Sequence, residues 1–185
     1  MTKTPIEIEI AKLHPFENHP FQVNDDENMD LLMTSIKENG VLSPIIVRPK
    51  ENAVDEYEII SGHRRFRAVQ RLGYKTIPAF LYDLDRDTAA VAVVDSNLHR
   101  ERLLPSEKAF AYKLKLDALK HQGKTINETS RQLVGKSETA DIISETDSGR
   151  QVQRYIRLTN LIPALLRYVD EGKIALTPAV ALSYL

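Results

Sequence analysis

The sequence of 185 residues contains no cysteine. Disulfide bonds, thiolate metal sites and cysteine catalysis are therefore excluded. No apolar run approaches the ~20 residues that a membrane-spanning helix needs, so we expect no membrane partner. The first residues lack the charged and apolar pattern of a secretory signal, and we therefore expect a cytoplasmic protein.

A strong net charge is also absent, because the formal charge is −1 at pH 7. This balance conceals an asymmetry between the two halves of the chain. Residues 1–95 carry 11 basic and 16 acidic side chains, a net charge of −5, whereas residues 96–185 carry 14 basic and 10 acidic ones, a net charge of +4. Because nucleic acid is a polyanion, we expect the second half to be the part that contacts it.

Short apolar strands and short helices alternate over residues 1–95, a pattern that is typical of an α+β or α/β layer. Strands are expected at residues 6–10, 41–47, 57–60 and 76–82. Helices are expected at residues 29–37, 64–72 and 85–97, the first two closed by Gly40 and Gly73. Pro78 is expected on a sheet edge, where a missing N–H is tolerated, and residues 13–22 are expected to form a proline-punctuated loop.

From Pro105 onward the pattern predicts helices only. They are expected at residues 105–122, 125–133, 148–158, 163–171 and 177–185, with a polar loop at residues 135–146. We therefore expect an α+β domain at residues 1–103 and an all-α domain at residues 104–185. Because the last helix would be cut by the end of the chain, we also expect that a C-terminal dimerisation domain is missing here.

Gly62 joins a strand to a helix that begins with basic residues. The arginines of that helix are Arg64, Arg65, Arg67 and Arg71. A glycine turn lets the backbone approach closely, and the first N–H groups of a helix are unsatisfied, so an anion is favoured there. Basic side chains at a helix N-terminus oppose the helix dipole, which makes phosphate the leading candidate. A solvated basic helix, with arginines paired to acids such as Glu56 and Glu58, fits the pattern equally well.

Residues 125–133 and 148–158 have the form of a helix-turn-helix. In the second helix, the apolar side chains that face inward are Val152, Ile156 and Leu158. The polar side chains left for its other faces are Arg150, Gln151, Gln153, Arg154 and Arg157. Arginine pairs with guanine and glutamine with adenine in the major groove, and the Ser148 hydroxyl would anchor a DNA phosphate. The alternative is an amphipathic helix with a solvated basic face.

Three stretches in order, residues 41–47, 62–68 and 96–109, together resemble the ParB family of chromosome and plasmid partition proteins. Residues 62–68 (GHRRFRA) resemble the family's G-E-R-R-x-R-A phosphate motif, and residues 96–109 resemble its E-N-x-Q-R-x-x-L-x-P-x-E-x-A stretch. Residues 41–47 resemble the segment that contacts the cytosine nucleotide. The resemblance implies a ParB/sulfiredoxin-like α+β domain followed by an all-α helix-turn-helix domain.

The resemblance also implies a DNA clamp that CTP switches. In the family, CTP binds the N-terminal domain, the helix-turn-helix reads a palindromic site on double-stranded DNA, and two subunits close around the DNA. This implies a homodimer at the nucleoid or on a plasmid, with a ParA-type ATPase as partner, in the segregation of a chromosome, plasmid or mobile element. Carried over by position, the nucleotide-binding residues are Ser43, Pro44, Gly62, His63, Arg64, Arg65, Asn97 and Arg100.

Two positions depart from the family pattern. His63 and Ser96 stand where the family has glutamates, whose carboxylates would hold Mg²⁺ or order the attacking water. Hydrolysis of CTP is therefore left open, with Asp95 and Glu101 as nearby substitutes. The alternative function is a nucleotide-dependent enzyme, a kinase or a nuclease, on the same scaffold. Sulfiredoxin shares this fold, but its catalytic cysteine is absent here.

Overall fold

A computed structural model gives the fold of residues 4–100, 102–126, 143–144 and 147–185. The chain divides into two compact units, Met1–Asp85 and Arg86–Leu185. Over the ranges that the structure describes, no helix is both long enough and apolar enough to span a bilayer.

The first unit is built on one mixed five-stranded sheet. Its strands are β1 (Ile6–Glu9), β2 (Leu13–Pro15), β3 (Ile45–Pro49), β4 (Tyr57–Ser61) and β5 (Thr76–Leu81). They lie in the order β1-β5-β3-β4-β2, and a short 3-10 turn, η1 (Ile10–Lys12), connects β1 to β2. The β1–β5 and β3–β4 pairs are antiparallel, whereas β3–β5 and β2–β4 are parallel. The predicted α+β architecture is confirmed for this unit.

Two details of the sheet differ from the sequence predictions. β2 lies within the predicted loop, where Leu13 is buried and pairs with Tyr57 of β4. Pro78 lies in an interior strand, because β5 stands between β1 and β3. However, the parallel ladder with β3 begins only at Ala79, so Pro78 faces a strand partner, Glu7, on one side alone. The missing N–H is therefore tolerated for the same reason as on an edge.

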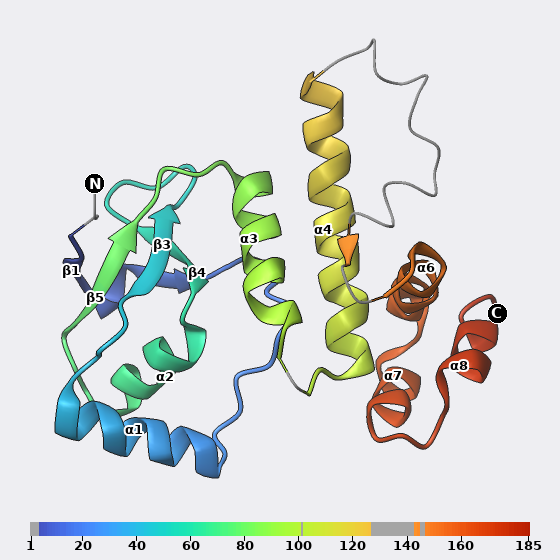
Figure 1. Ribbon diagram of the computed structural model, residues 1–185, viewed down its shortest axis with the longest axis horizontal. Coiled ribbons are helices and arrows are strands. Elements are labelled where there is room, and N and C mark those ends of the chain that lie inside the picture. Colours follow the sequence, from blue (N-terminus) through green and yellow to red (C-terminus); the bar gives the residue numbers. More distant parts are fainter. Residues whose placement is uncertain (1–3, 101, 127–142, 145–146) are drawn as a thin grey trace. The chain divides into compact units, whose positions relative to one another are not determined.

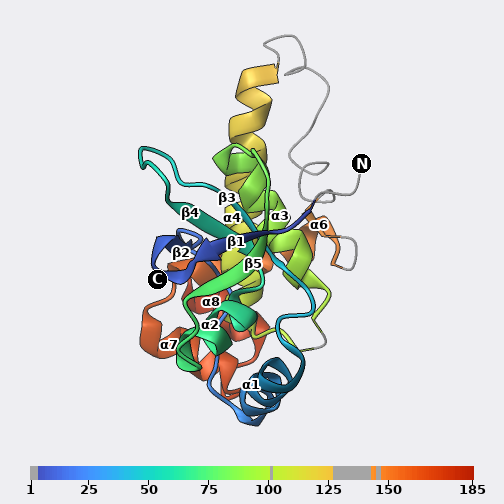
Figure 2. The ribbon, with the colours of Figure 1, turned by 90° about the vertical axis from the view of Figure 1, so that its left-hand side faces the viewer.

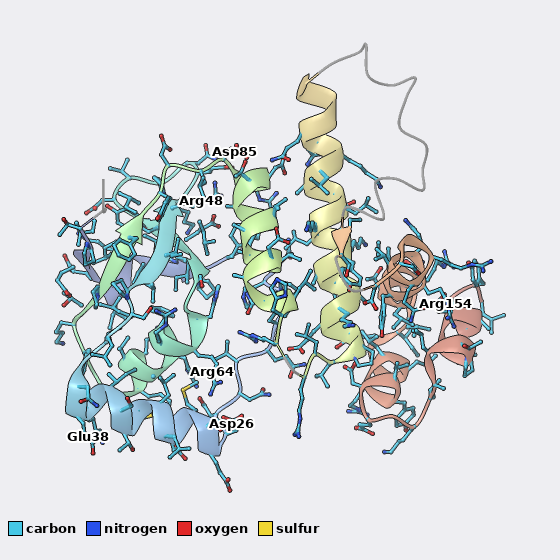
Figure 3. The ribbon with its side chains drawn as sticks, in the orientation of Figure 1. Asp26, Glu38, Arg48, Arg64, Asp85 and Arg154 are labelled. Carbon is cyan, nitrogen blue, oxygen red and sulfur yellow. The ribbon has the colours of Figure 1, made fainter. Side chains whose placement is uncertain are left out.

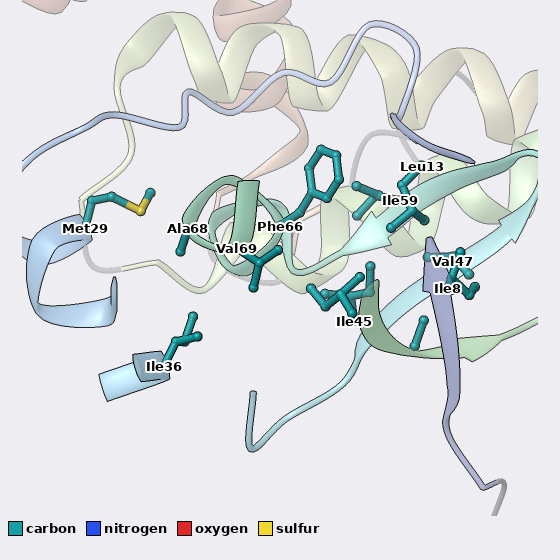
Figure 4. Packing of buried hydrophobic residues seen from close by; sticks show 12 residues of the cluster. Ile8, Leu13, Met29, Ile36, Ile45, Val47, Ile59, Phe66, Ala68 and Val69 are labelled. Carbon is teal, nitrogen blue, oxygen red and sulfur yellow. The ribbon is translucent and has the colours of Figure 1, made fainter. Parts of the chain in front are cut away.

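Two helices, α1 (Glu27–Asn39) and α2 (His63–Arg71), lie together below the sheet in Figures 1 and 2. Asp26 caps α1 by accepting a hydrogen bond from the backbone N–H of Met29 at 2.9 Å, and Gly40 ends the helix with φ 71°. The core of the unit includes side chains from both helices and the sheet (Figure 4). Its fully buried members include Met29, Ile45, Val47, Ile59 and Val69. Each such side chain contributes about 1.5–3 kcal/mol of burial free energy.

Every element described in the second unit is helical. These are α3 (Arg86–Leu98), α4 (Pro105–Ile126), α6 (Gly149–Arg157), the 3-10 turn η3 (Leu158–Asn160), α7 (Pro163–Asp170) and α8 (Leu176–Leu182). α4 continues through Gly123, which was predicted to end it, because an interior glycine costs a helix only about 1 kcal/mol. Thr125 therefore belongs to α4. The rest of the predicted helix 125–133, from residue 127, lies outside the described residues.

The boundary between the units falls before α3, whereas the sequence prediction placed it between residues 103 and 104. α3 packs along α4 within the second unit. The Lys115 ammonium lies 2.6 Å from the Asp95 carboxylate, and the Gln122 amide donates to the Thr88 hydroxyl at 3.2 Å. Motif order along the sequence carries no information about this packing.

A partly buried hydrogen-bond network lies at the N-terminal end of α6. The Tyr112 hydroxyl and the Lys108 ammonium donate to the same Asp147 oxygen, at 2.6 and 3.0 Å. The apolar cluster beside it consists of Tyr112, Ile143 and Val152, all fully buried. At the other end of the unit α8 ends at Leu182, so the prediction that the chain stops inside its last helix is wrong.

Candidate functional site

The turn at Gly62 requires glycine on two independent grounds. Its φ of 103° lies in the left-handed region, which side chains disfavour. A Cβ built there would come within 2.6 Å of the Ile45 Cγ2 atom and within 3.2 Å of an Arg65 Nη atom. Ile45 is fully buried at the start of β3, so it has no room to move aside. The start of α2 is therefore pressed against β3.

Arg65 is the arginine that faces this contact. Its guanidinium donates to the carbonyl oxygens of Ser43 and Pro44, the latter at 2.8 Å, and the side chain is partly buried. The carbonyls of Ser43 and Pro44 thus accept from Arg65, and the strand predicted at residues 41–47 begins only at Ile45. The structure brings Ser43, Pro44, Gly62 and Arg65 together.

Among the described residues, no acidic side chain pairs with Arg65. Burial lowers the pKa of its guanidinium, because desolvation disfavours the charged form. The two carbonyls accept from one guanidinium nitrogen, Nη1, without neutralising the charge, and no ion pair to Arg65 is found among the described residues. An anion placed here would restore the lost electrostatic stabilisation.

The other arginines of α2 pair with acids at the start of α1, not with Glu56 and Glu58. Arg67 binds both oxygens of Asp25, at 2.8 and 3.3 Å. Its hydrogen bond holds the pKa of the Asp25 carboxyl below the ordinary value. Arg71 lies 3.4 Å from Asp25 and 3.7 Å from Asp30. Arg67 and Arg71 therefore join the two helices.

Arg64 is held more loosely than Arg67. One of its Nη atoms lies 3.8 Å from the Asp26 carboxylate, and both side chains are substantially exposed to solvent (Figure 3). An exposed pair at this distance contributes little to stability, so the Arg64 guanidinium is available to an incoming anion.

The acids that the sequence offered as partners are used elsewhere in the sheet. Glu58 accepts two hydrogen bonds from the Arg48 guanidinium, at 2.6 and 2.8 Å, and these residues are only 7% and 2% exposed. Burial works against the charge of Arg48, but hydrogen bonds to Glu51 and Glu58 outweigh it and raise the pKa of the guanidinium. Glu56 contacts His14 and Lys50 at 3.1 and 3.2 Å. The buried ion pair between Arg48 and Glu58 was not predicted.

His63 is the first residue of α2 and only 7% exposed. Its ring stacks on the ring of His19, with centroids 3.7 Å apart and an angle of 34° between the planes. The His19 Nδ1 atom in turn lies 2.9 Å from the Phe21 carbonyl oxygen. His19 was expected in a loop, and its contact with His63 was not predicted, because nothing local in residues 13–22 indicates it.

Three further positions of the family motif, Ser96, Asn97 and Arg100, belong to the second unit. The Asn97 amide donates to the Val93 carbonyl at 2.8 Å and to the Ser96 hydroxyl at 3.1 Å, and Asn97 is buried. The Ser96 hydroxyl donates to the same carbonyl at 3.0 Å. Arg100 is exposed just beyond the end of α3.

The helix predicted at residues 148–158, with Ser148 as its cap, is confirmed as α6. The Ser148 hydroxyl accepts a hydrogen bond from the backbone N–H of Gln151 at 3.4 Å, and Val152 is fully buried. Arg150 and Gln153 are exposed to solvent. This outer face therefore carries part of the predicted polar set.

Two arginines of α6 also bind within the second unit. Arg154, labelled in Figure 3, donates to the Gln151 side chain at 3.2 Å and to the Thr177 hydroxyl at 2.6 Å. Arg157 donates to the Ser183 carbonyl at 2.6 Å, and its guanidinium lies 3.7 Å from the centre of the Tyr184 ring. Arg157 thus joins α6 to the residues that follow α8, a contact that was not predicted, and its place in a DNA site stays a prediction.

Comparison with known proteins gives one family. A model of the ParB N-terminal domain matches residues 2–98. A nucleoid occlusion protein of Listeria innocua is 40% identical over 135 residues, which cover 73% of this chain and 45% of that protein. The probable chromosome 1-partitioning protein ParB of Deinococcus radiodurans is 36% identical over 175 residues, covering 94% of this chain and 54% of that protein. The chain thus spans about half the length of these relatives.

A solved structure resembles the chain over nearly its whole length. It is the C-terminally truncated chromosome-partitioning protein ParB of Caulobacter crescentus, complexed to the centromeric parS site. The TM-score is 0.56 and the sequence identity 26%, with 96% of this chain and 84% of that chain covered.

Proposed function

The chain belongs to the ParB family, and on that premise we propose that it is a DNA-binding partition protein whose first unit binds a nucleoside triphosphate. Residues 1–103 form the nucleotide-binding domain in this proposal and residues 104–185 the DNA-binding domain. The protein acts in segregation of a chromosome, plasmid or mobile element, and CTP is the nucleotide that the family resemblance implies.

The observation that carries the nucleotide site is the partly buried charge of Arg65 beside the Gly62 turn. A guanidinium whose hydrogen bonds within the described part of the chain go to two carbonyls, next to the N-terminus of α2, favours a polyanion at that place. Arg64 lies on the same turn of helix with a loosely held acid partner. Ser43 and Pro44 are assigned to the base, and Asn97 and Arg100 to the triphosphate, by their positions in the family motifs.

The DNA site of the proposal is the outer face of α6, in a helix-turn-helix. Arg150 and Gln153 are exposed there, and Arg154 is partly exposed at the same face. Arginine and glutamine are the residue types that read guanine and adenine edges in the major groove. The relative that is solved on a parS duplex supports DNA as the partner of this unit. A palindromic site, a homodimeric clamp and a ParA-type ATPase complete the proposal by family resemblance.

Calorimetric titration with the four ribonucleoside triphosphates, with and without a palindromic parS-type duplex, tests this function. We expect heat with CTP and little with the other three. We also expect DNA binding that weakens steeply as the salt concentration rises, because phosphate contacts release counterions. Absence of heat with every nucleotide would remove the nucleotide from the proposal, and salt-independent DNA binding would remove the DNA site.

A further inference from the structure

We propose that the site beside Gly62 binds its polyphosphate without a divalent metal ion held by this chain. The inference rests on the proposed function, because it concerns the same site. In the ParB resemblance, two motif glutamates would hold Mg²⁺ or order the attacking water, and the described residues place a histidine and a serine at those two positions, without a carboxylate.

His63 occupies the first of the two glutamate positions. Its imidazole is almost completely buried and stacks on the His19 ring at 3.7 Å. Mg²⁺ takes oxygen ligands in near-octahedral geometry and keeps most of its water, so a ring nitrogen in this setting is a poor donor. A histidine here adds no negative charge to the turn, unlike the glutamate of the family.

Ser96 occupies the second glutamate position, and its hydroxyl is used within α3. It donates to the Val93 carbonyl and accepts from the Asn97 amide, at 3.0 and 3.1 Å. Asp95, the substitute that the sequence suggested, binds the Lys115 ammonium of α4 at 2.6 Å. The other substitute, Glu101, lies outside the described residues.

The acids closest in sequence to the start of α1 are also engaged. Both oxygens of Asp25 bind Arg67, and Asp26 accepts the capping hydrogen bond from Met29 while facing Arg64. Within the ranges that the structure describes, no three histidine, aspartate or glutamate side chains gather so that they could hold a metal ion. Asp25 and Asp26 therefore pair with arginines of α2 instead of forming a metal site.

The positive charge that a triphosphate requires is supplied by the protein. Arg65, Arg64 and the N-terminus of α2, which has no acidic residue in its first turn, surround the Gly62 turn. Magnesium removes part of the negative charge of a free triphosphate. A purely cationic site therefore attracts the metal-free nucleotide at least as strongly as the magnesium complex.

Titration of the wild-type chain with CTP in excess EDTA, and again in millimolar Mg²⁺, tests the inference. We expect the Kd in EDTA to be no more than about fivefold weaker than in Mg²⁺. A larger weakening in EDTA would overturn the inference while leaving the nucleotide site in place. No heat in either buffer would overturn both the inference and the nucleotide part of the proposed function.

Two variants assign the effect to His63. His63→Glu restores the family carboxylate, and we expect its CTP binding to become more than about tenfold weaker in EDTA than in Mg²⁺. His63→Gln adds no charge, so its Kd for CTP in EDTA should be no more than about fivefold weaker than in Mg²⁺, as in the wild type. The assignment to His63 would be contradicted by a His63→Glu protein that folds, as judged by circular dichroism, but binds CTP in EDTA as well, relative to Mg²⁺, as the wild type does. If this variant does not fold, the wild-type titration decides the inference alone.

Discussion

The two arginine-bearing helices, α2 in the first unit and α6 in the second, begin in opposite ways. α6 is capped by its own serine, since the Ser148 hydroxyl accepts a hydrogen bond from the Gln151 N–H. α2 begins at a left-handed glycine, and the structure shows no side-chain cap on its first turn. α2 therefore begins without a cap from its N-cap residue, whereas the side chain of Ser148 caps α6.

Arginines that look alike in the sequence also differ in what their side chains contact. In each helix one arginine binds another part of the same unit. Arg67 of α2 binds Asp25, and Arg157 of α6 contacts Ser183 and Tyr184. In our proposal each helix also has an arginine that contacts a partner, Arg65 in α2 and the exposed Arg150 in α6. The partner of each guanidinium, more than the motif around it, indicates its function.

The largest effect is expected from Gly62→Ala. The new Cβ would meet Ile45 at 2.6 Å in a backbone of φ 103°, so we expect a loss of about 3 kcal/mol in the free energy of unfolding. Gly73→Ala is the matched control, because Gly73 has φ 74° but nothing within 4 Å of its Cβ position; it should cost about 1 kcal/mol. Urea unfolding measures both. Equal losses would contradict the close approach of α2 to β3.

A second test separates the arginines of α6. Arg157→Ala removes a hydrogen bond and a ring contact, so it should lower the free energy of unfolding by about 1–2 kcal/mol. Arg150→Ala should leave unfolding unchanged within about 0.5 kcal/mol but weaken DNA binding by about tenfold. Urea melts and fluorescence anisotropy with a labelled duplex distinguish the two. An Arg150→Ala protein that binds DNA normally would remove this face from the DNA site.

The smallest effect concerns acid stability in the second unit. Burial pushes the pKa of Asp147 upward, but hydrogen bonds from Tyr112 and Lys108 outweigh it and lower the pKa below its ordinary value of 3.8. A carboxyl with a depressed folded pKa stabilises the fold above its unfolded pKa, and this contribution is lost as the pH falls through the folded pKa. Tyr112→Phe should therefore cost about 1 kcal/mol at pH 7, and less below pH ~4. Urea melts at both values measure this difference, and an equal cost at both would contradict it.

The sequence predicted what local rules determine. The Gly40 end of α1, the Ser148 cap of α6 and the turn at Gly62 all follow from residues within one helical turn of the feature. Arg67 was expected near an anion or near acids such as Glu56 and Glu58, and instead it pairs with Asp25, 42 residues away. No local signal specifies such a pairing, because it depends on how α1 packs on α2.

The same limit applies to the candidate site. The family motifs predicted that Gly62 and Arg65 lie near residues 43–44. They did not predict that the strand begins only at Ile45, or that the carbonyls of residues 43 and 44 accept hydrogen bonds from Arg65. The stacking of His19 on His63 was missed for the same reason. Tertiary contacts between loops are set by the whole fold, and a single sequence does not contain them in a local form.

Calorimetric titration of CTP into Arg65→Ala and Arg67→Ala tests the central claim most directly. Both variants remove one arginine from α2, but only Arg65 is partly buried at the turn without an acid partner among the described residues. We predict that Arg65→Ala weakens CTP binding by about 100-fold or more, while Arg67→Ala changes it by less than about threefold. Equal losses in the two variants, or wild-type affinity in Arg65→Ala, would contradict the claim that the Gly62 turn and Arg65 form a polyphosphate site.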